Sequence, residues 1–289
     1  MTDRDILLAA CRQAGVDASH AELIRASENA LFRLPGHIVA RVTRPGQLAA
    51  ATKEVRVARW LRSADLPVVE AVPDIDQPQV VEGRAVTFWR ELQEHTAGTL
   101  PQLAMLLRRL HRVPLPDFEL PPLQPFVRQR ERIAEATAIR DEDRAWLLDH
   151  LASLEVRYAD LPPGQPCCAV HGDAWTGNVA VTSTGPVLLD LERFAVGPPE
   201  WDLTSTAVRY TTDGTCTAQE WAAYCDAYGS DVTTWAGYSI LRDARELRRT
   251  TFALQMAPTR ADIAAQASYR LACIQGLRGP RPWGWTAVP

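Results

Sequence analysis

The chain has 289 residues, 46% of them hydrophobic and 23% charged, which suits a folded protein of one large domain or two lobes. Its net charge of −4 gives no sign of attraction to nucleic acid or to a membrane surface. No apolar run approaches the ~20 residues of a membrane span and the N-terminus lacks a basic leader, so we expect a cytoplasmic protein.

The first part of the chain is predicted to form a small antiparallel sheet with a helix inserted between its strands. Apolar residues at helical spacing predict helices, and β-prone runs bounded by turn formers predict strands. In chain order these elements are a helix over 2–14, strands over 30–34 and 37–42, a helix over 47–62, and strands over 68–71 and 85–89.

After Leu92 the pattern becomes mostly helical. The predicted helices cover 100–113, 126–139, 142–160, 217–228, 239–256 and 259–277, and a hairpin over 178–190 interrupts them. We therefore predict an α+β protein with a small N-terminal lobe, 1–92, and a large, mostly helical C-terminal lobe, 93–289, that carries the hairpin.

The most informative segment runs from His171 to Asn178, with Asp190 further along the chain. Two short β-prone runs separated by turn formers predict a hairpin centred on Thr184. This centre would place Asn178 opposite Asp190, and directly opposed strand residues lie ~5 Å apart. Oxygen ligands at this separation suit a hard cation such as Mg²⁺. Asp173 would face the same point from a loop, which is the skeleton of a phosphoryl-transfer site.

Several common catalytic motifs are absent from the sequence. No Gly-Lys pair occurs, so there is no P-loop, and neither GxSxG nor HExxH is found. No GxGxxG follows a predicted strand, which leaves a dinucleotide-binding unit unsupported. The six cysteines include no CxxC pair, so we expect buried core residues rather than a zinc site or a disulfide framework.

The sequence resembles the aminoglycoside phosphotransferase and choline kinase superfamily, whose fold is similar to that of protein kinases. Three segments carry the resemblance: His171-Gly172-Asp173 with Asn178, then Asp190-Leu191-Glu192, and then Gly197-Pro198-Pro199-Glu200-Trp201-Asp202-Leu203. It covers about three-quarters of the chain and is most specific over 171–203.

The resemblance implies a role for each of the central polar residues. Asp173 would orient the acceptor hydroxyl toward the γ-phosphate, while Asn178 and Asp190 would hold Mg²⁺. Glu192 is equally a second metal ligand or an exposed carboxylate. The alternative for an isolated Asp and Asn is that they satisfy the backbone of their own turn, but the further carboxylates favour function.

Two other residues of these segments are expected to support the site. The resemblance gives Asp202 a structural role, in which it binds backbone amides of the loop that carries Asp173. His171 is also expected to be structural, because Gly172 places a backbone turn beside Asp173.

The nucleotide site needs a cation on a strand that is paired with a helix carboxylate. Arg41 is the strand candidate and Glu54 is its partner, with a surface ion pair as the alternative reading. Lys53 is the only lysine of the chain, but it lies beside Glu54 on the predicted helix and cannot replace the strand residue.

Two further segments complete the predicted nucleotide site. A loop over 26–29, which contains Ser27 and Asn29, would cover the phosphates through amides and a hydroxyl, with an ordinary β-turn as the alternative. The adenine would be read by the backbone of a hinge made of Trp89, Arg90, Glu91 and Leu92.

We therefore expect a phosphotransferase that uses Mg²⁺ and ATP, or GTP, to phosphorylate a hydroxyl of a small molecule, as in aminoglycoside resistance. A metabolite kinase for an amino sugar, choline, ethanolamine or another alcohol is the alternative. It is favoured by the seven acids against nine arginines in 203–289, since a polycation needs acidic groups. A nucleotide-binding pseudokinase is a third possibility, motivated by the glycine-free loop and the absent strand lysine. We expect a monomer or a dimer that binds neither nucleic acid nor membranes.

Overall fold

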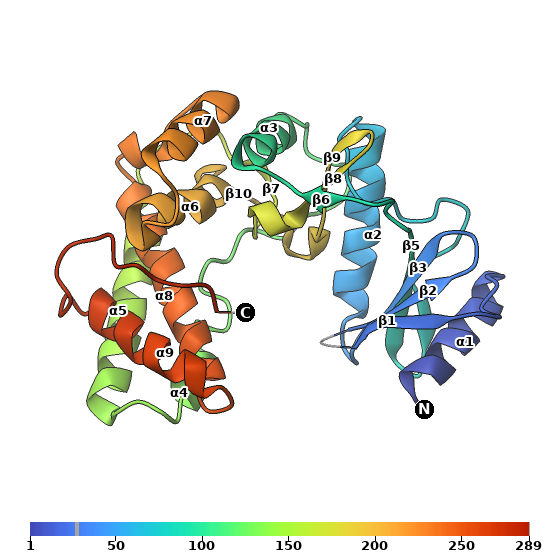
Figure 1. Ribbon diagram of the computed structural model, residues 1–289, viewed down its shortest axis with the longest axis horizontal. Coiled ribbons are helices and arrows are strands. Elements are labelled where there is room, and N and C mark those ends of the chain that lie inside the picture. Colours follow the sequence, from blue (N-terminus) through green and yellow to red (C-terminus); the bar gives the residue numbers. More distant parts are fainter. Residues whose placement is uncertain (27–28, 289) are drawn as a thin grey trace. The chain divides into compact units, whose positions relative to one another are not determined.

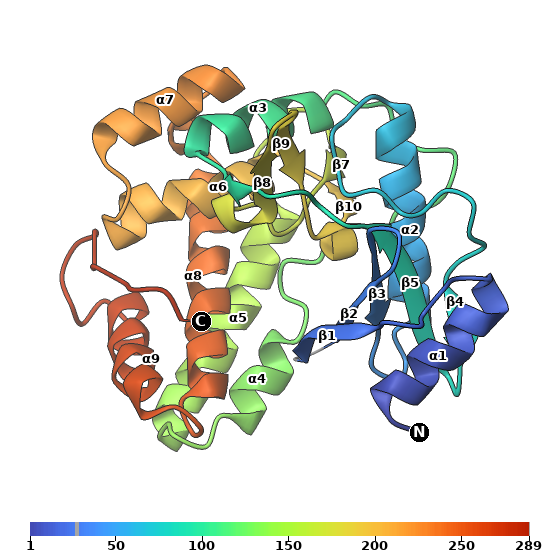
Figure 2. The ribbon, with the colours of Figure 1, turned by 45° about the vertical axis from the view of Figure 1, so that its right-hand side comes forward.

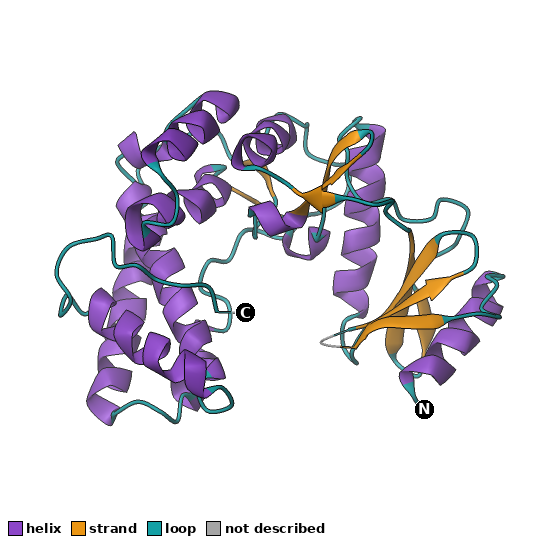
Figure 3. Ribbon diagram, viewed as in Figure 1, coloured by secondary structure: helices purple, strands orange, loops and turns teal. Residues whose placement is uncertain are grey.

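The computed structural model describes residues 1–26 and 29–288, which form two compact units (Figures 1 and 3). The N-terminal unit consists of Met1–Gln102, Arg112–Pro121 and Thr176–Phe194, and the C-terminal unit of Leu103–His111, Pro122–Trp175 and Ala195–Pro289. Most strands belong to the first unit and most long helices to the second, as the predicted α+β architecture requires. The division of roles between a nucleotide lobe, 1–92, and a catalytic lobe, 93–289, stays a prediction.

The first helix, α1 (Asp3–Ala14), confirms the prediction for 2–14. Thr2 and Asp5 form a capping box, in which each side chain accepts a hydrogen bond from the other residue's backbone amide. Gly15 ends the helix at φ 68°, a left-handed conformation that glycine adopts without steric cost.

The N-terminal unit contains an antiparallel sheet of five strands in the order β1-β2-β3-β5-β4. The strands are β1 (Glu22–Ala26), β2 (Ala30–Leu34), β3 (Ile38–Val42), β4 (Gln79–Val81) and β5 (Arg84–Arg90). The predicted hairpin over 30–42 is confirmed as β2 and β3, and the predicted strand over 85–89 is β5.

The two faces of this sheet have different partners, because successive strand residues point to opposite sides. Phe32 and Phe88 pack with Leu7 of α1 in one apolar cluster. Arg41 points to the other face, where it pairs with Glu54 of α2 (Leu48–Ser63). On that face α2 lies against β5 (Figure 1). The sheet therefore separates a core of its own from the surface that carries the predicted nucleotide residues.

The predicted strand over 68–71 is wrong. Only two isolated bridges form there, from Val68 to Leu188 and from Ala71 to Trp89. These bridges join the segment to two different elements, so no continuous ladder develops along it. The backbone amide of Val69 also donates a hydrogen bond to Leu188 O at 3.1 Å, which attaches this segment to the hairpin that ends at Leu188.

The second hairpin consists of β8 (Val179–Thr182) and β9 (Gly185–Leu188), and β8 also pairs with the short β6 (Thr96–Ala97). Its predicted register is wrong by one residue. Val179 pairs with Leu188, and the amide of Leu189 donates to Asn178 O at 2.9 Å. Asn178 is therefore opposite Leu189 rather than Asp190, because only Ser183 and Thr184 separate the two strands.

The C-terminal unit is built mainly from helices around α8 (Tyr238–Met256), which packs against its neighbours α4, α5, α6 and α9 (Figures 1 and 2). Leu147, Leu151, Leu247 and Leu254 are among the residues of its apolar core. The helices are α3 (Leu100–Leu110), which begins in the N-terminal unit, α4 (Gln129–Glu135), α5 (Asp141–Ala159), α6 (Glu200–Val208), α7 (Ala218–Tyr228), α8 and α9 (Ala261–Ile274).

Most of the predicted C-terminal helices are present with small changes at their ends, but two differences matter. The helix predicted over 126–139 is shortened to α4, because Arg128 at φ 62° cannot continue it and Ala136 is extended. The sequence patterns missed α6, which follows Pro199 and continues into a π-helical turn, η3 (Arg209–Asp213). They also missed the paired strands β7 (Cys168–Val170) and β10 (Ala195–Gly197).

The cysteines follow the prediction only in part. All six are free; Cys11, Cys168, Cys216 and Cys273 are buried, whereas Cys167 is exposed. Over the ranges that the structure describes, no helix has both the length and the apolar character to cross a membrane.

Candidate active site

Arg41 on β3 and Glu54 on α2 form a buried ion pair. Arg41 Nη1 donates to Glu54 Oε1 at 3.1 Å, and Nη2 donates to Oε2. The side chains are only 16% and 4% exposed, so this is not the exposed pair considered as an alternative from the sequence. Burial alone would lower the pKa of Arg41, but the charge and hydrogen bonds of Glu54 outweigh it and raise the pKa. The guanidinium therefore stays charged.

The carboxylates of Asp190 and Glu192 lie near this pair. Both raise the pKa of Arg41 electrostatically, as Glu54 does more strongly. Burial raises the pKa of Glu54, and Asp190 and Glu192 act in the same direction against Arg41. The structure thus brings together, within the N-terminal unit, the predicted phosphate cation, its helix partner and two predicted metal ligands.

Lys53 also belongs to this group, which the sequence did not predict. Its Nζ donates to the backbone oxygen of Phe194 at 3.0 Å, and so ties α2 to the turn after Asp190. Burial lowers the pKa of Lys53, although Glu192 and Glu54 oppose this shift. Lys53 does not take the place of Arg41 on the strand, but it holds the segment that carries Glu192.

The predicted metal ligands come from the two ends of the second hairpin. Asn178 ends the short turn η1 (Thr176–Asn178) and is 7% exposed, whereas Asp190 is exposed. Asp190 has φ 55°, a left-handed conformation that is uncommon outside glycine, and this turn ends the strand. Glu192 therefore does not continue the strand but lies in the turn η2 (Leu191–Arg193), where its side chain is exposed.

The donor set fits Mg²⁺. No group of three or more His, Cys, Asp or Glu residues that could hold a metal is present among the residues described. Magnesium does not require one, because it keeps several waters and binds through one or two carboxylates together with substrate phosphates. Asn178 and Asp190 supply an amide oxygen and a carboxylate of this kind, and the metal would neutralise negative charge on the phosphates.

The predicted hinge lies at the end of β5. The amides of Arg90 and Glu91 already donate, to Glu70 O and His37 O, each at 2.8 Å. An N–H has one hydrogen, so these two residues can offer only carbonyl oxygens to a base. Trp89 is 8% exposed and its ring lies 5.7 Å from the Arg41 guanidinium.

The predicted phosphate loop joins β1 to β2. Ser27 lies outside the described residues, and Asn29 is half-buried immediately before β2. Asn29 is therefore placed at the start of β2, in the sheet that also carries Arg41.

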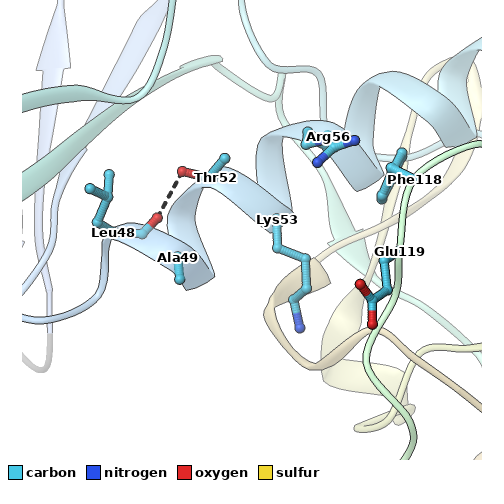
Figure 4. Close-up of a pocket in the computed structure, with 7 residues that line it drawn as sticks. All are labelled: Leu48, Ala49, Thr52, Lys53, Arg56, Phe118 and Glu119. Carbon is cyan, nitrogen blue, oxygen red and sulfur yellow. Dashed lines mark hydrogen bonds between the residues drawn. The ribbon is translucent and has the colours of Figure 1, made fainter.

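A groove of about 530 Å³ follows the outer side of α2 (Figure 4). Its walls combine the N-terminal half of the helix with the segment that contains Phe118, whose ring lies 4.2 Å from the Arg56 guanidinium. The lining residues are Leu48, Ala49, Thr52, Lys53, Arg56, Phe118 and Glu119. Lys53 thus lines this groove, and its Nζ contacts the backbone oxygen of Phe194, close to Glu192.

In the C-terminal unit, Asp202 holds the loop that carries Asp173. Its two carboxylate oxygens accept hydrogen bonds from the amides of His171 at 2.7 Å and Gly172 at 2.9 Å. His111 donates from Nε2 at 3.1 Å. Burial alone would raise the pKa of Asp202, but the hydrogen bond and charge of His111, with His171, outweigh it and lower the pKa. Asp202 is thus a buried, ionised anchor for the loop.

Asp173 follows β7 and has a side chain that is 40% exposed. The backbone around it is fixed further by Trp201, whose Nε1 donates to Gly172 O at 3.0 Å. His171 itself is fully buried. Asp173 therefore presents an accessible carboxylate on a loop whose neighbouring peptide groups are held in place.

The sequence did not predict the positions of three residues around this loop: His111, Trp201 and Arg245. Arg245 Nη1 lies 3.9 Å from Asp173 Oδ1. No local pattern identifies His111 or Arg245, because each is far from the loop in sequence. Trp201 stood within a recognised motif, but its sequence neighbours do not reveal what its indole contacts.

Comparison with protein families gives one match, which covers most of the chain. The model of the family named APH and described as "Phosphotransferase enzyme family" matches residues 21–241. No curated protein matches the chain significantly.

Solved structures with a similar fold are numerous. Amicoumacin kinase hAmiN, in complex with AMP-PNP, Ca²⁺ and Ami, is 14% identical with a TM-score of 0.69, over 96% of this chain and 95% of that one. Choline kinase LicA from Streptococcus pneumoniae is 16% identical with a TM-score of 0.65, over 93% and 99%. Aminoglycoside phosphotransferase APH(3'')-Id from Streptomyces rimosus is 20% identical with a TM-score of 0.58, over 84% and 99%. At these identities the similarity concerns the fold.

Proposed function

Because this chain belongs to the phosphotransferase enzyme family, we propose that it transfers the γ-phosphoryl group of ATP, or GTP, to a hydroxyl of a small molecule with the help of Mg²⁺. The observation that carries this proposal is the buried Arg41–Glu54 pair beside Asp190 and Glu192. A fixed cation next to metal-binding carboxylates is the arrangement that a triphosphate with its metal requires.

The N-terminal unit supplies the groups proposed to bind the nucleotide. Arg41 donates to phosphate oxygens, with Glu54 fixing its guanidinium. Asn178 and Asp190, with Glu192 as a further candidate, hold Mg²⁺, which offsets phosphate charge when bound. Ser27 and Asn29 cover the phosphates, and the carbonyl groups of the hinge, Trp89–Leu92, contact the base. We assign the nucleotide role to 1–92, to which Asn178, Asp190 and Glu192 add the metal ligands, and the catalytic role to the remainder of 93–289.

Asp173 is the proposed catalytic residue. Its carboxylate accepts a hydrogen bond from the acceptor hydroxyl and takes up the proton as the oxygen bonds to phosphorus. The bond between the γ-phosphorus and its bridging oxygen breaks at the same time, and the nucleoside diphosphate leaves with that electron pair. Asp202 and His171 act by holding the loop.

The acceptor is proposed to be a metabolite rather than a polycationic antibiotic, for one structural reason. All acidic residues of 203–289 except the exposed Asp226 are hydrogen bonded within the chain. Their partners are Arg249 for Asp213, Thr217 for Glu220, Thr233 for Asp231, Arg242 for Asp243, Arg281 for Glu246 and Arg260 for Asp262. A polycation would have to compete with these internal partners for the carboxylates. The similar structures include both choline kinase and an aminoglycoside phosphotransferase, so both classes belong in a screen.

An ADP-release assay over aminoglycosides, amino sugars, peptide antibiotics and aminoalcohols tests the proposal. We expect Mg²⁺-dependent turnover that drops by about 100-fold or more in Asp173→Asn, the usual scale for a catalytic acid or base. Nucleotide affinity should be unchanged, and Asp226→Asn serves as the control at an exposed carboxylate. Undiminished turnover in Asp173→Asn would refute the role of this residue. If nucleotide binds but is not turned over with any acceptor or with water, the protein is a pseudokinase.

A further inference from the structure

Arg245 is a buried arginine of α8 that lies beside the proposed catalytic carboxylate. Its residue is 5% exposed, and its Nη1 is 3.9 Å from Asp173 Oδ1. We propose that Arg245 is a positioning residue that orients the carboxylate of Asp173 toward the acceptor hydroxyl. This inference rests on the proposed function, in which Asp173 contacts the acceptor.

Arg245 is itself fixed by Trp201. Its guanidinium carbon lies 3.9 Å from the centre of the Trp201 ring, and Nη2 donates to Trp201 O at 2.9 Å. Stacking on the ring and a bond to the same residue's carbonyl leave the planar group one orientation. The Nη1 edge is consequently held toward Asp173.

Trp201 also binds the loop that carries Asp173 directly. The indole Nε1 donates to Gly172 O, next to Asp173 in the chain. The peptide and the carboxylate of the loop are therefore positioned by one assembly, composed of Trp201 and Arg245. A displacement of Trp201 would move both contacts together.

The charges favour this role over simple packing. Moving a guanidinium from water to a site that is 5% exposed carries a large desolvation cost, which a nearby carboxylate offsets. Asp173 keeps 40% of its side chain exposed, so it can contact Arg245 and still meet an acceptor. At 3.9 Å the pair is electrostatic rather than a short hydrogen bond, which leaves the carboxylate oxygens able to accept one from the hydroxyl.

A double-mutant cycle separates this role from a structural one. Arg245→Gln, Asp173→Asn and the double variant are compared in the ADP-release assay, with water as acceptor if no better one is known. We expect Arg245→Gln to lower kcat by about 10- to 100-fold, the scale of a misplaced catalytic group. The KM for nucleotide should stay within about twofold. In the Asp173→Asn background the same change should have no further effect on kcat.

Matched variants keep the result interpretable. Arg242→Gln removes a more exposed arginine of the same helix, paired with Asp243, and should leave kcat unchanged. If Arg245→Gln does not fold, as judged by circular dichroism, the cycle is run with Arg245→Lys, which keeps the charge without the planar fork.

The outcomes distinguish the two proposals. Wild-type protein without nucleotide turnover overturns the proposed function and this inference with it. Active wild-type protein whose folded Arg245 variant retains its kcat overturns the inference alone. The inference is also overturned if Arg245→Gln lowers kcat by the same factor in wild-type protein and in Asp173→Asn. Arg245 would then act through a group other than the Asp173 carboxylate.

Discussion

His111 and Asp202 are joined by a hydrogen bond of 3.1 Å from Nε2 to Oδ2, although α3 and α6 carry them in distant parts of the sequence. The same carboxylate accepts hydrogen bonds from the backbone amides of His171 and Gly172. The Nδ1 atom of His111 lies 2.9 Å from the Tyr228 hydroxyl, so the imidazole is held on both sides. A buried carboxylate thus connects two helices to the loop of the proposed catalytic residue.

Replacing His111 by leucine should weaken both the fold and the loop. Asp202 is fully buried and would lose a charged hydrogen bond, which costs about 1.5–3 kcal/mol. We expect the free energy of unfolding, measured in urea, to fall by this amount and kcat to fall with it. His20→Leu, at an exposed histidine, is the control. Equal stability of the His111 variant and wild type would show that Asp202 does not depend on this bond.

The Arg41–Glu54 pair should be necessary for nucleotide binding but not for stability. Glu54→Gln leaves a buried guanidinium without its counter-charge, which costs about 3–5 kcal/mol. Replacing both residues, by Arg41→Met and Glu54→Leu, removes both charges and should recover most of that loss. We expect the double variant to melt near wild type in calorimetry while its affinity for nucleotide, measured by titration calorimetry, is lost. Retained affinity would assign the pair a structural role.

Removal of divalent metal should abolish turnover. We expect EDTA to stop ADP release and Mg²⁺ to restore it, since a metal held by Asn178 and Asp190 would offset the charge that develops on the phosphates. Asp190→Ala should raise the Mg²⁺ concentration needed for half-maximal rate by about tenfold or more. Asp74→Ala, at an exposed acid of the same unit, should not change it. Turnover that is insensitive to EDTA would refute the metal site.

His150 should make stability depend on pH. Its imidazole stacks on Trp146 with ring centroids 4.7 Å apart, and burial lowers its pKa. The unfolded chain therefore binds the proton more tightly, so stability is full above the ordinary pKa of about 6.5 and declines as pH falls through that value. We expect the melting temperature to drop less between pH 7 and 5 in His150→Gln than in wild type. An identical slope in the variant would contradict this assignment, and His20→Gln is the control.

The fold was predictable where short-range patterns are strong. The capping box of Thr2 and Asp5 and the turn between β2 and β3 are encoded by neighbouring residues. The segment over 68–71 was misassigned because its residues are apolar enough for a strand, but the structure provides partners at two single points. The helix α6 follows a Gly-Pro-Pro run and is short, so helical periodicity did not reveal it.

The hairpin illustrates the limit of local patterns at the site itself. A run of turn formers fixes where the chain reverses only to within a residue, and the register error at Asn178 followed from this. The left-handed backbone of Asp190 gave no signal, because aspartate is compatible with many conformations. The candidate residues were chosen by their types and spacing, but the local geometry that places them could not be predicted in this way.

The sequence by itself determined which residues are candidates for the site: Asp173, Asn178 and Asp190 stand at the spacing of a phosphotransferase motif, and Arg41 and Glu54 lie on a predicted strand and helix. These features depend on the order of residues and on the periods of helices and strands, which neighbouring residues set. Only the tertiary structure decided that Arg245 lies beside Asp173, that Trp201 binds Gly172 O, that His111 binds Asp202 and that Lys53 ties α2 to the turn after Asp190. Such contacts arise when packing brings distant segments together, because the hydrophobic effect that drives packing is non-directional and leaves no local pattern.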